Sequence, residues 1–205
     1  MKIVTDRWER FLDPDVVRPS LFLATMYITT FEILKNSVVD RIQSFYINGL
    51  DEEGPILGPE YKTEVTYRSK SVLYASLDWL RAREVIDEKD LEIFEQLKIT
   101  RNRLAHQLFS VVTGQVESTH EAQFEVLVSL LRKIEVWWVV NFEIATSPEF
   151  DGQDIDEDGI IPGAVLSLQM LIEVASGNTE LLEHWRKSRV QHRTDANPST
   201  GNGHI

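Results

Sequence analysis

The sequence contains no cysteine among its 205 residues. That absence excludes disulfide bonds, thiolate zinc sites, iron–sulfur clusters and cysteine nucleophiles. The sequence also lacks a run of about 18 consecutive apolar residues, and its first residues lack the apolar segment of a signal peptide. We therefore expect a soluble, cytoplasmic protein that makes no membrane contact.

Positive charge is also scarce, because 21 Lys and Arg stand against 33 Asp and Glu, which gives a formal net charge of −12. This surplus of negative charge argues against a protein that binds nucleic acid over its whole surface, but it does not exclude a local basic groove. No two histidines lie three or four residues apart, which excludes a metal pair on one helix. Motifs of serine hydrolases, phosphate-binding loops and dinucleotide-binding folds are absent too, so we expect no metal and no cofactor.

Apolar residues at helical spacing, separated by Gly and Pro, predict an all-α fold. We expect an up-and-down bundle of four to five helices in a single domain over residues 1–187, followed by a disordered polar tail at 188–205. The turn-rich stretch 51–60 is interpreted as a loop. The predicted helices cover about 20–48, 66–83, 88–112, 118–146, 162–177 and, as a short last piece, 179–187.

The fourth predicted helix has apolar side chains on two faces, which indicates either a central helix or a subunit interface. Ser118 and Glu121 have the spacing of a capping box at its start. Trp137 and Trp138 fit a core or an interface better than a platform for stacked bases. The acidic run 154–159 after this helix matches part of a calcium-binding loop, but Val165 stands where the bidentate Glu belongs, so we interpret the run as a solvated linker.

The third predicted helix carries the unusual side chains. At about 100° per residue, Arg101 lies at the centre of the apolar stripe of this helix. An unpaired guanidinium is costly there, so Arg101 must meet an acid, a phosphate or a water-filled cleft. Asn102 and His106 form an i, i+4 pair on the adjoining flank.

The arrangement of Arg101, Asn102 and His106 near the end of an amphipathic helix resembles the HEPN superfamily. The motif of that family is an Arg and a His separated by four to six residues, often with a polar residue directly after the Arg. In HEPN proteins paired with a nucleotidyltransferase antitoxin, a Tyr stands two residues after the His; here that position is Leu108, which puts modification of such a Tyr in doubt.

The resemblance implies a metal-independent endoribonuclease that cleaves RNA through the 2′-OH at a composite site in a homodimer. It also implies a toxin or phage-defence effector with a possible antitoxin or regulatory partner. The residues suit this chemistry, because an imidazole with a pKa of about 6.5 can move the proton and a guanidinium can stabilise the phosphate charge. Lys98 and Arg103 on the same helix would add RNA contacts.

Two other interpretations remain open. The first is a catalytically silent HEPN-like module for dimerisation or regulation, and the second is a helical adaptor in which the motif is a coincidence. Arg101 would then pair with a carboxylate such as Glu32 or Asp40, and His106 would be an ordinary flank residue. Arg101 and His106 lining one open cleft between two subunits would favour the enzyme, whereas an Arg101 sealed in an intrachain ion pair would favour the module.

Overall fold

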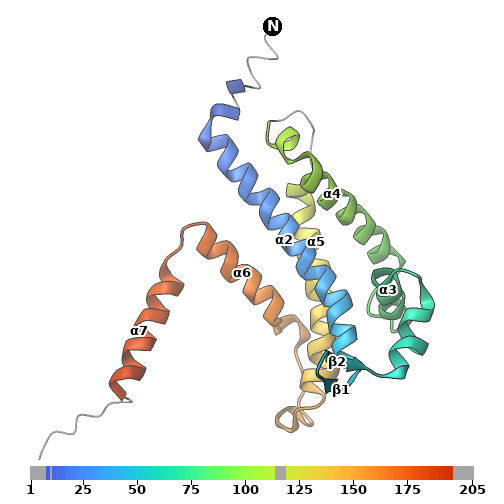
Figure 1. Ribbon diagram of the computed structural model, residues 1–205. Coiled ribbons are helices and arrows are strands. Elements are labelled where there is room, and N and C mark those ends of the chain that lie inside the picture. The colour runs from blue at the N-terminus through green and yellow to red at the C-terminus, as the bar shows by residue number, and fades with distance from the viewer. Residues whose placement is uncertain (1–7, 10, 114–118, 196–205) are drawn as a thin grey trace, which may run out of the picture. The chain divides into compact units, whose positions relative to one another are not determined.

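A computed structural model describes residues 8–9, 11–113 and 119–195 (Figure 1). The described chain is mostly helical, which confirms the all-α prediction. It divides into two compact units, Met1–Val165 and Leu166–Ile205, where the sequence analysis expects a single domain over 1–187. We call these the N-terminal and the C-terminal unit and describe each by itself.

The helices follow the predicted order, with shifted ends. They are α2 (Pro14–Phe45), α3 (Val72–Ala82), α4 (Glu88–Val112), α5 (His120–Trp138), α6 (Gly163–Ala175) and α7 (Glu180–Asp195). A π-helical stretch at Val139–Ile144 continues α5, and shorter π and 3₁₀ turns at Tyr61–Val65 and Thr66–Arg68 precede α3. The helix expected at 66–83 is therefore split, and only its second part is a regular α-helix.

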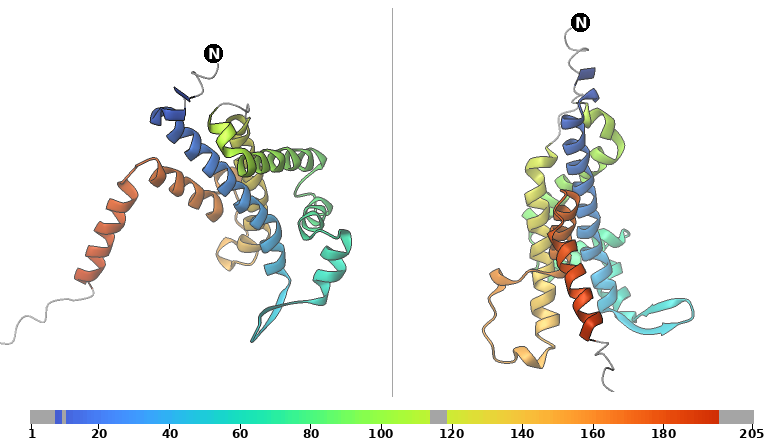
Figure 2. Two further views of the ribbon diagram at one scale, coloured as in Figure 1. Left: turned by 45° about the horizontal axis from the view of Figure 1, so that its top comes forward. Right: turned by 90° about the vertical axis from the view of Figure 1, so that its left-hand side faces the viewer.

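Helix α2 is the centre of the N-terminal unit and packs against α3, α4 and α5. Figures 1 and 2 show that α4 runs opposite to α2 and α5, so the end of α4 lies beside the start of α2. The buried side chains of α2 recur every three to four residues, and burying each large one contributes about 1.5–3 kcal/mol. The fully enclosed side chains of this core include Tyr27, Leu34, Ile42, Trp79, Leu80, Phe94, Leu97, Leu104, Leu127, Leu131 and Ile134.

Two polar contacts connect the three long helices within this core. Tyr27 Oη on α2 donates to the Leu97 carbonyl of α4 at 3.2 Å and contacts Gln123 Oε1 of α5 at 3.3 Å. Burial raises the pKa of Tyr27 to about 12, so the phenol keeps its proton and acts as a donor. Arg41 on α2 forms an ion pair at 2.6 Å with Glu135 of α5, whose side chain is only 2% exposed.

Helix α4 begins with a capping box, in which Asp87 and Asp90 each accept a hydrogen bond from the other's backbone N–H. It ends at Val112, as the sequence predicts. Gln107 inside it has non-helical dihedral angles (φ −128°, ψ 25°), so the helix is kinked directly after His106. An ideal rotation of about 100° per residue therefore holds up to His106 but not beyond it.

Helix α5 is largely covered within its own chain, which favours the central-helix alternative. Leu130 is buried and Trp137 packs against the core, although both belong to the second apolar face. Val126 on that face stays 40% exposed. Trp138 is buried, as expected for a core residue. Ser118 lies outside the described residues, and Thr119, which directly precedes α5, forms no side-chain capping bond.

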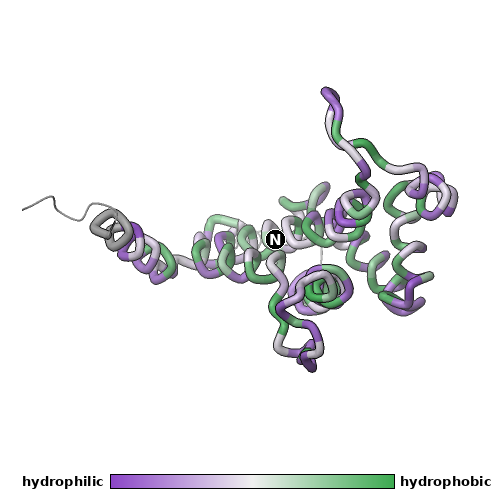
Figure 3. Tube along the Cα trace, turned by 90° about the horizontal axis from the view of Figure 1, so that it is seen from below, coloured by the Kyte–Doolittle hydropathy of each residue, from purple (hydrophilic) through white to green (hydrophobic). Residues whose placement is uncertain are grey.

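Two further sequence expectations, on the turn-rich stretch and on the start of the first helix, are wrong. The stretch expected to be a loop contains a two-stranded antiparallel hairpin, β1 (Ile47–Asp51) and β2 (Gly54–Leu57). Asp51 Oδ1 accepts from the backbone N–H groups of Glu53 and Gly54, which closes the turn and leaves a hydrophilic tip (Figure 3). The strands are too short and too exposed to produce a hydrophobic alternation in the sequence.

The second wrong expectation concerns the start of the first helix, which precedes Pro19 rather than following it. Asp13 caps α2 and Pro14 occupies its first turn, so the helix is already formed when it reaches Pro19. Ser20 Oγ donates to the Val16 carbonyl at 2.8 Å, within the turn that the missing N–H of Pro19 weakens.

The described part of the C-terminal unit consists of α6 from Leu166 onward and of the whole of α7. Helix α7 continues to Asp195, so residues 188–195 are helical where the polar tail was expected to begin, and 196–205 lie outside the described residues. By length and composition alone, Glu157–Ala175 is apolar enough to cross a membrane, with a mean hydropathy of 1.4. The α-helix within it has 13 residues, which at about 1.5 Å each is shorter than a hydrocarbon core of about 30 Å.

Candidate functional site

Arg101 is paired with an acid from another helix, which is one of the three partners that its place on the apolar stripe allows. Its Nη2 atom lies 2.5 Å from Glu32 Oε1 on α2, whereas Asp40, the other acid considered, is not a partner. The two side chains are 29% and 35% exposed, so the ion pair is neither sealed nor free in solvent. The Nε atom of Arg101 is buried and has no hydrogen-bond partner within the described chain.

The carboxylate of Glu32 is held ionised by two cations. Partial burial would raise the pKa of Glu32, but hydrogen bonds and charge from Arg101 and Lys35 outweigh it and lower the pKa. Lys35 Nζ lies 3.3 Å from Glu32 Oε2, one turn along the same helix. At neutral pH, a phosphate that approaches Arg101 must therefore compete with the charged carboxylate of Glu32.

Asn102 connects Arg101 to the outer flank of α4. Arg101 Nη1 donates to Asn102 Oδ1 at 3.2 Å, and Asn102 itself is exposed. This contact holds the guanidinium at the surface of the helix, where it can meet an anion. The Nδ2 group of the amide remains able to donate to an oxygen of a ligand.

His106 is exposed on the same flank, one turn beyond Asn102 and directly before the kink at Gln107. No hydrogen bond or ion pair joins it to another side chain in the described part of the chain. Within one chain, a hydrogen bond joins Arg101 to Asn102, whereas no hydrogen bond among the described residues joins His106 to either of them.

Lys98 and Arg103, the two expected RNA contacts, differ in their surroundings. Lys98 Nζ donates to Tyr74 Oη of α3, lies 4.7 Å from the centre of that ring and is 3.6 Å from Glu95. The hydrogen bond to Tyr74 raises the pKa of Lys98, so the ammonium is charged but already engaged. Arg103 is half-buried and has no ion-pair partner among the described residues. Tyr74 was missed by the sequence analysis, because nothing in α3 shows that this face meets α4.

The Arg101–Glu32 pair predicts a pH-dependent contribution to stability. Because the folded pKa of Glu32 is lowered, the pair stabilises the fold above the usual Glu pKa of about 4.3 and ceases to do so as the pH falls through the lowered value. Glu32→Gln should lower the free energy of unfolding at neutral pH by at most about 1 kcal/mol, as expected for a half-exposed pair. Urea unfolding followed by circular dichroism, repeated at decreasing pH, measures this difference.

The matched control repeats the Glu32→Gln substitution in an Arg101→Gln background. The effect of Glu32→Gln should be smaller there, because only the contact with Lys35 remains. An effect of equal size in both backgrounds, or one that persists in acid, would contradict the pairing.

The acidic linker forms no metal site among the described residues, because no three His, Asp or Glu side chains lie close enough together to hold a metal ion. The side chain of Arg132 on α5 instead binds the backbone of this loop. Its Nη2 donates to the carbonyls of Glu157, Asp158 and Ile160 at 2.9–3.2 Å. These carbonyls are engaged by a cation, which makes them unsuitable as calcium ligands.

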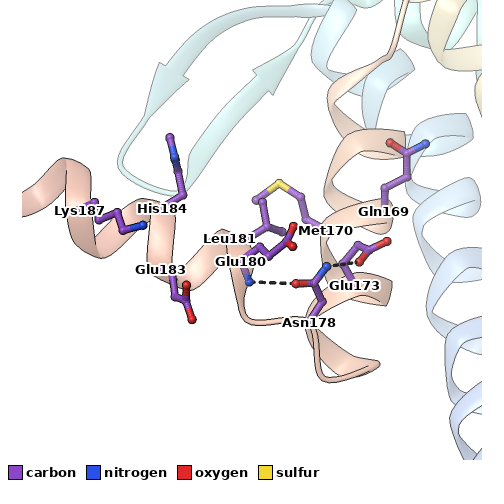
Figure 4. Close-up of a pocket in the computed structure, with 9 residues that line it drawn as sticks. All are labelled: Gln169, Met170, Glu173, Asn178, Glu180, Leu181, Glu183, His184 and Lys187. Atoms are coloured by element: carbon purple, nitrogen blue, oxygen red, sulfur yellow. Dashed lines mark hydrogen bonds between the residues drawn. The ribbon is translucent and has the colours of Figure 1, made fainter.

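A cavity of about 690 Å³ lies between α6 and α7 in the C-terminal unit (Figure 4). Asn178 spans its edge, since its side chain donates to Glu173 and accepts from the backbone N–H of Glu180. None of the candidate residues of α4 lines this cavity. Comparisons with protein-family models, with curated proteins and with solved structures found no match to this chain, so the functional interpretation rests on its own residues.

Proposed function

We propose that this chain is a metal-independent endoribonuclease of the HEPN type. The observation that carries the proposal is the surface of α4, where a partly exposed Arg101 is tied to Asn102 and an exposed His106 stands one turn further on. A fixed cation and an imidazole on one helix flank suit acid–base cleavage of a phosphodiester. The resemblance of the motif to HEPN proteins supports the same chemistry.

The site is proposed to be complete only in a homodimer. Helices α2 to α5 would form the up-and-down HEPN bundle, and the α4 helices of two copies would face each other across one cleft. No hydrogen bond joins His106 to Arg101 among the described residues, so an imidazole from the second copy would complete the site. RNA is the proposed substrate, and an antitoxin or regulatory partner would control the enzyme as part of a toxin or phage-defence system in the cytoplasm.

The proposed reaction needs no group beyond these side chains. The 2′-OH loses its proton to His106, and the 2′-oxygen forms a bond to phosphorus as the bond to the 5′-oxygen breaks. The leaving 5′-oxygen takes up the proton that His106 has received, which restores the neutral imidazole and yields a 2′,3′-cyclic phosphate and a 5′-OH. Arg101 would stabilise the charge on the phosphate oxygens, with Asn102 holding the guanidinium in place and Lys98 and Arg103 contacting the strand.

Incubation of the purified chain with RNA, with and without EDTA, tests this function. We expect cleavage in both samples and a rate about 10²–10⁴-fold lower for His106→Ala, because acid–base catalysis by one side chain contributes that much. His184→Ala is a matched control, since His184 is an exposed helical histidine of the C-terminal unit. Activity that requires magnesium, or that survives in His106→Ala, would overturn the proposal.

The second candidate, a silent dimerisation or regulatory module, is favoured by the Arg101–Glu32 ion pair. This pair satisfies the guanidinium without any substrate. Sedimentation and RNA cleavage, measured on the same preparation, separate the two candidates. A dimer that leaves RNA intact supports the module, whereas a monomer removes the composite site.

A further inference from the structure

Three aromatic side chains lie together where the start of the chain meets the end of α4. The ring centres of Trp8 and Phe11 are 5.9 Å apart, and those of Phe11 and Phe109 are 5.3 Å apart. Trp8 and Phe109 are both 58% exposed, so each presents more than half of its surface to solvent. We call these three residues the aromatic platform.

The platform is continuous with the candidate site. Phe109 follows His106 by three residues, on the short segment of α4 beyond the kink at Gln107. The two ring contacts extend this surface from α4 to the residues before α2 (Figures 1 and 2). A ligand bound at Arg101 and His106 can therefore reach the platform without leaving this end of the unit.

Two helical segments near the platform carry no acid. No Asp or Glu occurs at 16–31 of α2 or at 99–112 of α4, although the chain carries a net charge of −12. Acids at the same end are Glu9, Asp13 and Asp15 beside Trp8 and Phe11, and Glu121 and Glu125 of α5, all of them exposed. The two acid-free segments belong to helices that pack against each other, and they form a surface suited to an anion.

Two arginines on these segments have no ion-pair partner among the residues that the structure describes. Among the described arginines of the N-terminal unit, all except Arg18 and Arg103 form an ion pair or bind backbone carbonyls. Arg18 lies on the same side of α2 as Glu32, because 14 residues make about four helical turns. Unpaired guanidinium groups thus lie on both helices of the acid-free surface, where they can hold phosphates.

We infer that the aromatic platform binds an unpaired base of a single-stranded nucleic acid, whose phosphates contact Arg18 and Arg103. Exposed rings offer a base a stacking face, and a base paired in a duplex has no free face for them. A second copy of this chain is a less suitable occupant, since its net charge would bring further acids rather than phosphates to the same arginines. The inference rests on the proposed function in one respect: under that function, the bound strand is the RNA that the chain cleaves.

Binding of a strand that cannot be cut tests the inference apart from cleavage. The probe is a fluorescent single-stranded deoxyadenylate of about 12 nucleotides, and fluorescence anisotropy gives its affinity. Phe109→Ala and Trp8→Ala should each weaken binding about 5- to 150-fold, the equivalent of losing one stacked base. An abasic strand of the same length should bind weakly and should not distinguish the variants from the wild type.

Two further variants keep the test independent of folding. Phe109→Leu retains an apolar contact with Phe11 but removes the aromatic face, and it should weaken binding like Phe109→Ala. Tyr67→Ala removes an aromatic side chain that is 66% exposed outside the platform, and it should bind like the wild type.

The outcomes separate the inference from the proposed function. Base-dependent binding without RNA cleavage would uphold the platform and overturn the ribonuclease. RNA cleavage with unchanged affinity in Phe109→Ala and Trp8→Ala would overturn the platform alone. Loss of self-association in these variants, with binding of the strand unaffected, would assign the surface to a second copy and would also overturn the inference.

Discussion

Replacement of the ribose at the cut site by deoxyribose should abolish RNA cleavage by this chain. The proposed nucleophile is the 2′-oxygen next to the broken phosphodiester, and deoxyribose lacks it. The site around Arg101 offers an imidazole, an amide and guanidinium groups, which can move a proton and stabilise charge but do not replace the nucleophile. The cut site is mapped first on an all-ribose strand, and the chimeric strand is then analysed by gel electrophoresis and mass spectrometry.

The matched control places the single deoxyribose one nucleotide away from the cut site. That strand should be cleaved at the normal rate and should end in a 2′,3′-cyclic phosphate. Cleavage of the first strand, or of DNA at a similar rate, would show that water or another external nucleophile attacks the phosphate.

Trp79→Ala should be the most destabilising single substitution in the aromatic part of the core. Trp79 is fully buried, stacks on Trp138 at 5.9 Å with an interplanar angle of 12°, and lies under the guanidinium of Arg83 at 3.6 Å. Its Nε1 donates to Tyr46 Oη at 3.0 Å. Loss of a buried Trp costs about 3–5 kcal/mol, which is a large part of the stability of a domain.

Urea unfolding measured by far-ultraviolet circular dichroism gives the size of this loss. Trp79→Phe retains a ring in the same place and removes the hydrogen bond, so its effect should lie between those of the wild type and Trp79→Ala. Tyr67→Ala on the surface should change the free energy of unfolding by no more than about 0.5 kcal/mol. A loss of similar size in Tyr67→Ala and Trp79→Ala would contradict the packing described above.

Helical periodicity was sufficient to predict that Arg101 needs a polar partner. Its place on the apolar stripe called for an acid, a phosphate or a water-filled cleft, and Glu32 was one of the two acids named as examples. The position of α4 between residues 88 and 112 followed from the spacing of its apolar residues and from Gly114 after its end. Side-chain period and capping chemistry are local properties, so they can be read from the sequence.

Other features depend on contacts between distant segments. Gln107 is neither Gly nor Pro, so nothing local marks the kink that follows His106. Phe109 contacts Phe11, which is 98 positions away in the sequence, and Lys98 on α4 contacts Tyr74 on α3. Helical periodicity also does not say whether Glu32 or Asp40 reaches Arg101, because that choice depends on how α2 and α4 are aligned.

The ion pair between Arg41 and Glu135 fixes the register of α2 against α5. Apolar side chains at helical spacing tolerate a slide of one turn, about 5.4 Å, because each then meets another apolar neighbour. The same slide would separate Arg41 from a carboxylate that is 2% exposed and would leave that charge unpaired in the interior, at a cost of several kcal/mol. Because Glu32 is also on α2, this distant pair fixes the height of Glu32 along α5 as well, while the packing of α2 against α4 brings Glu32 to Arg101.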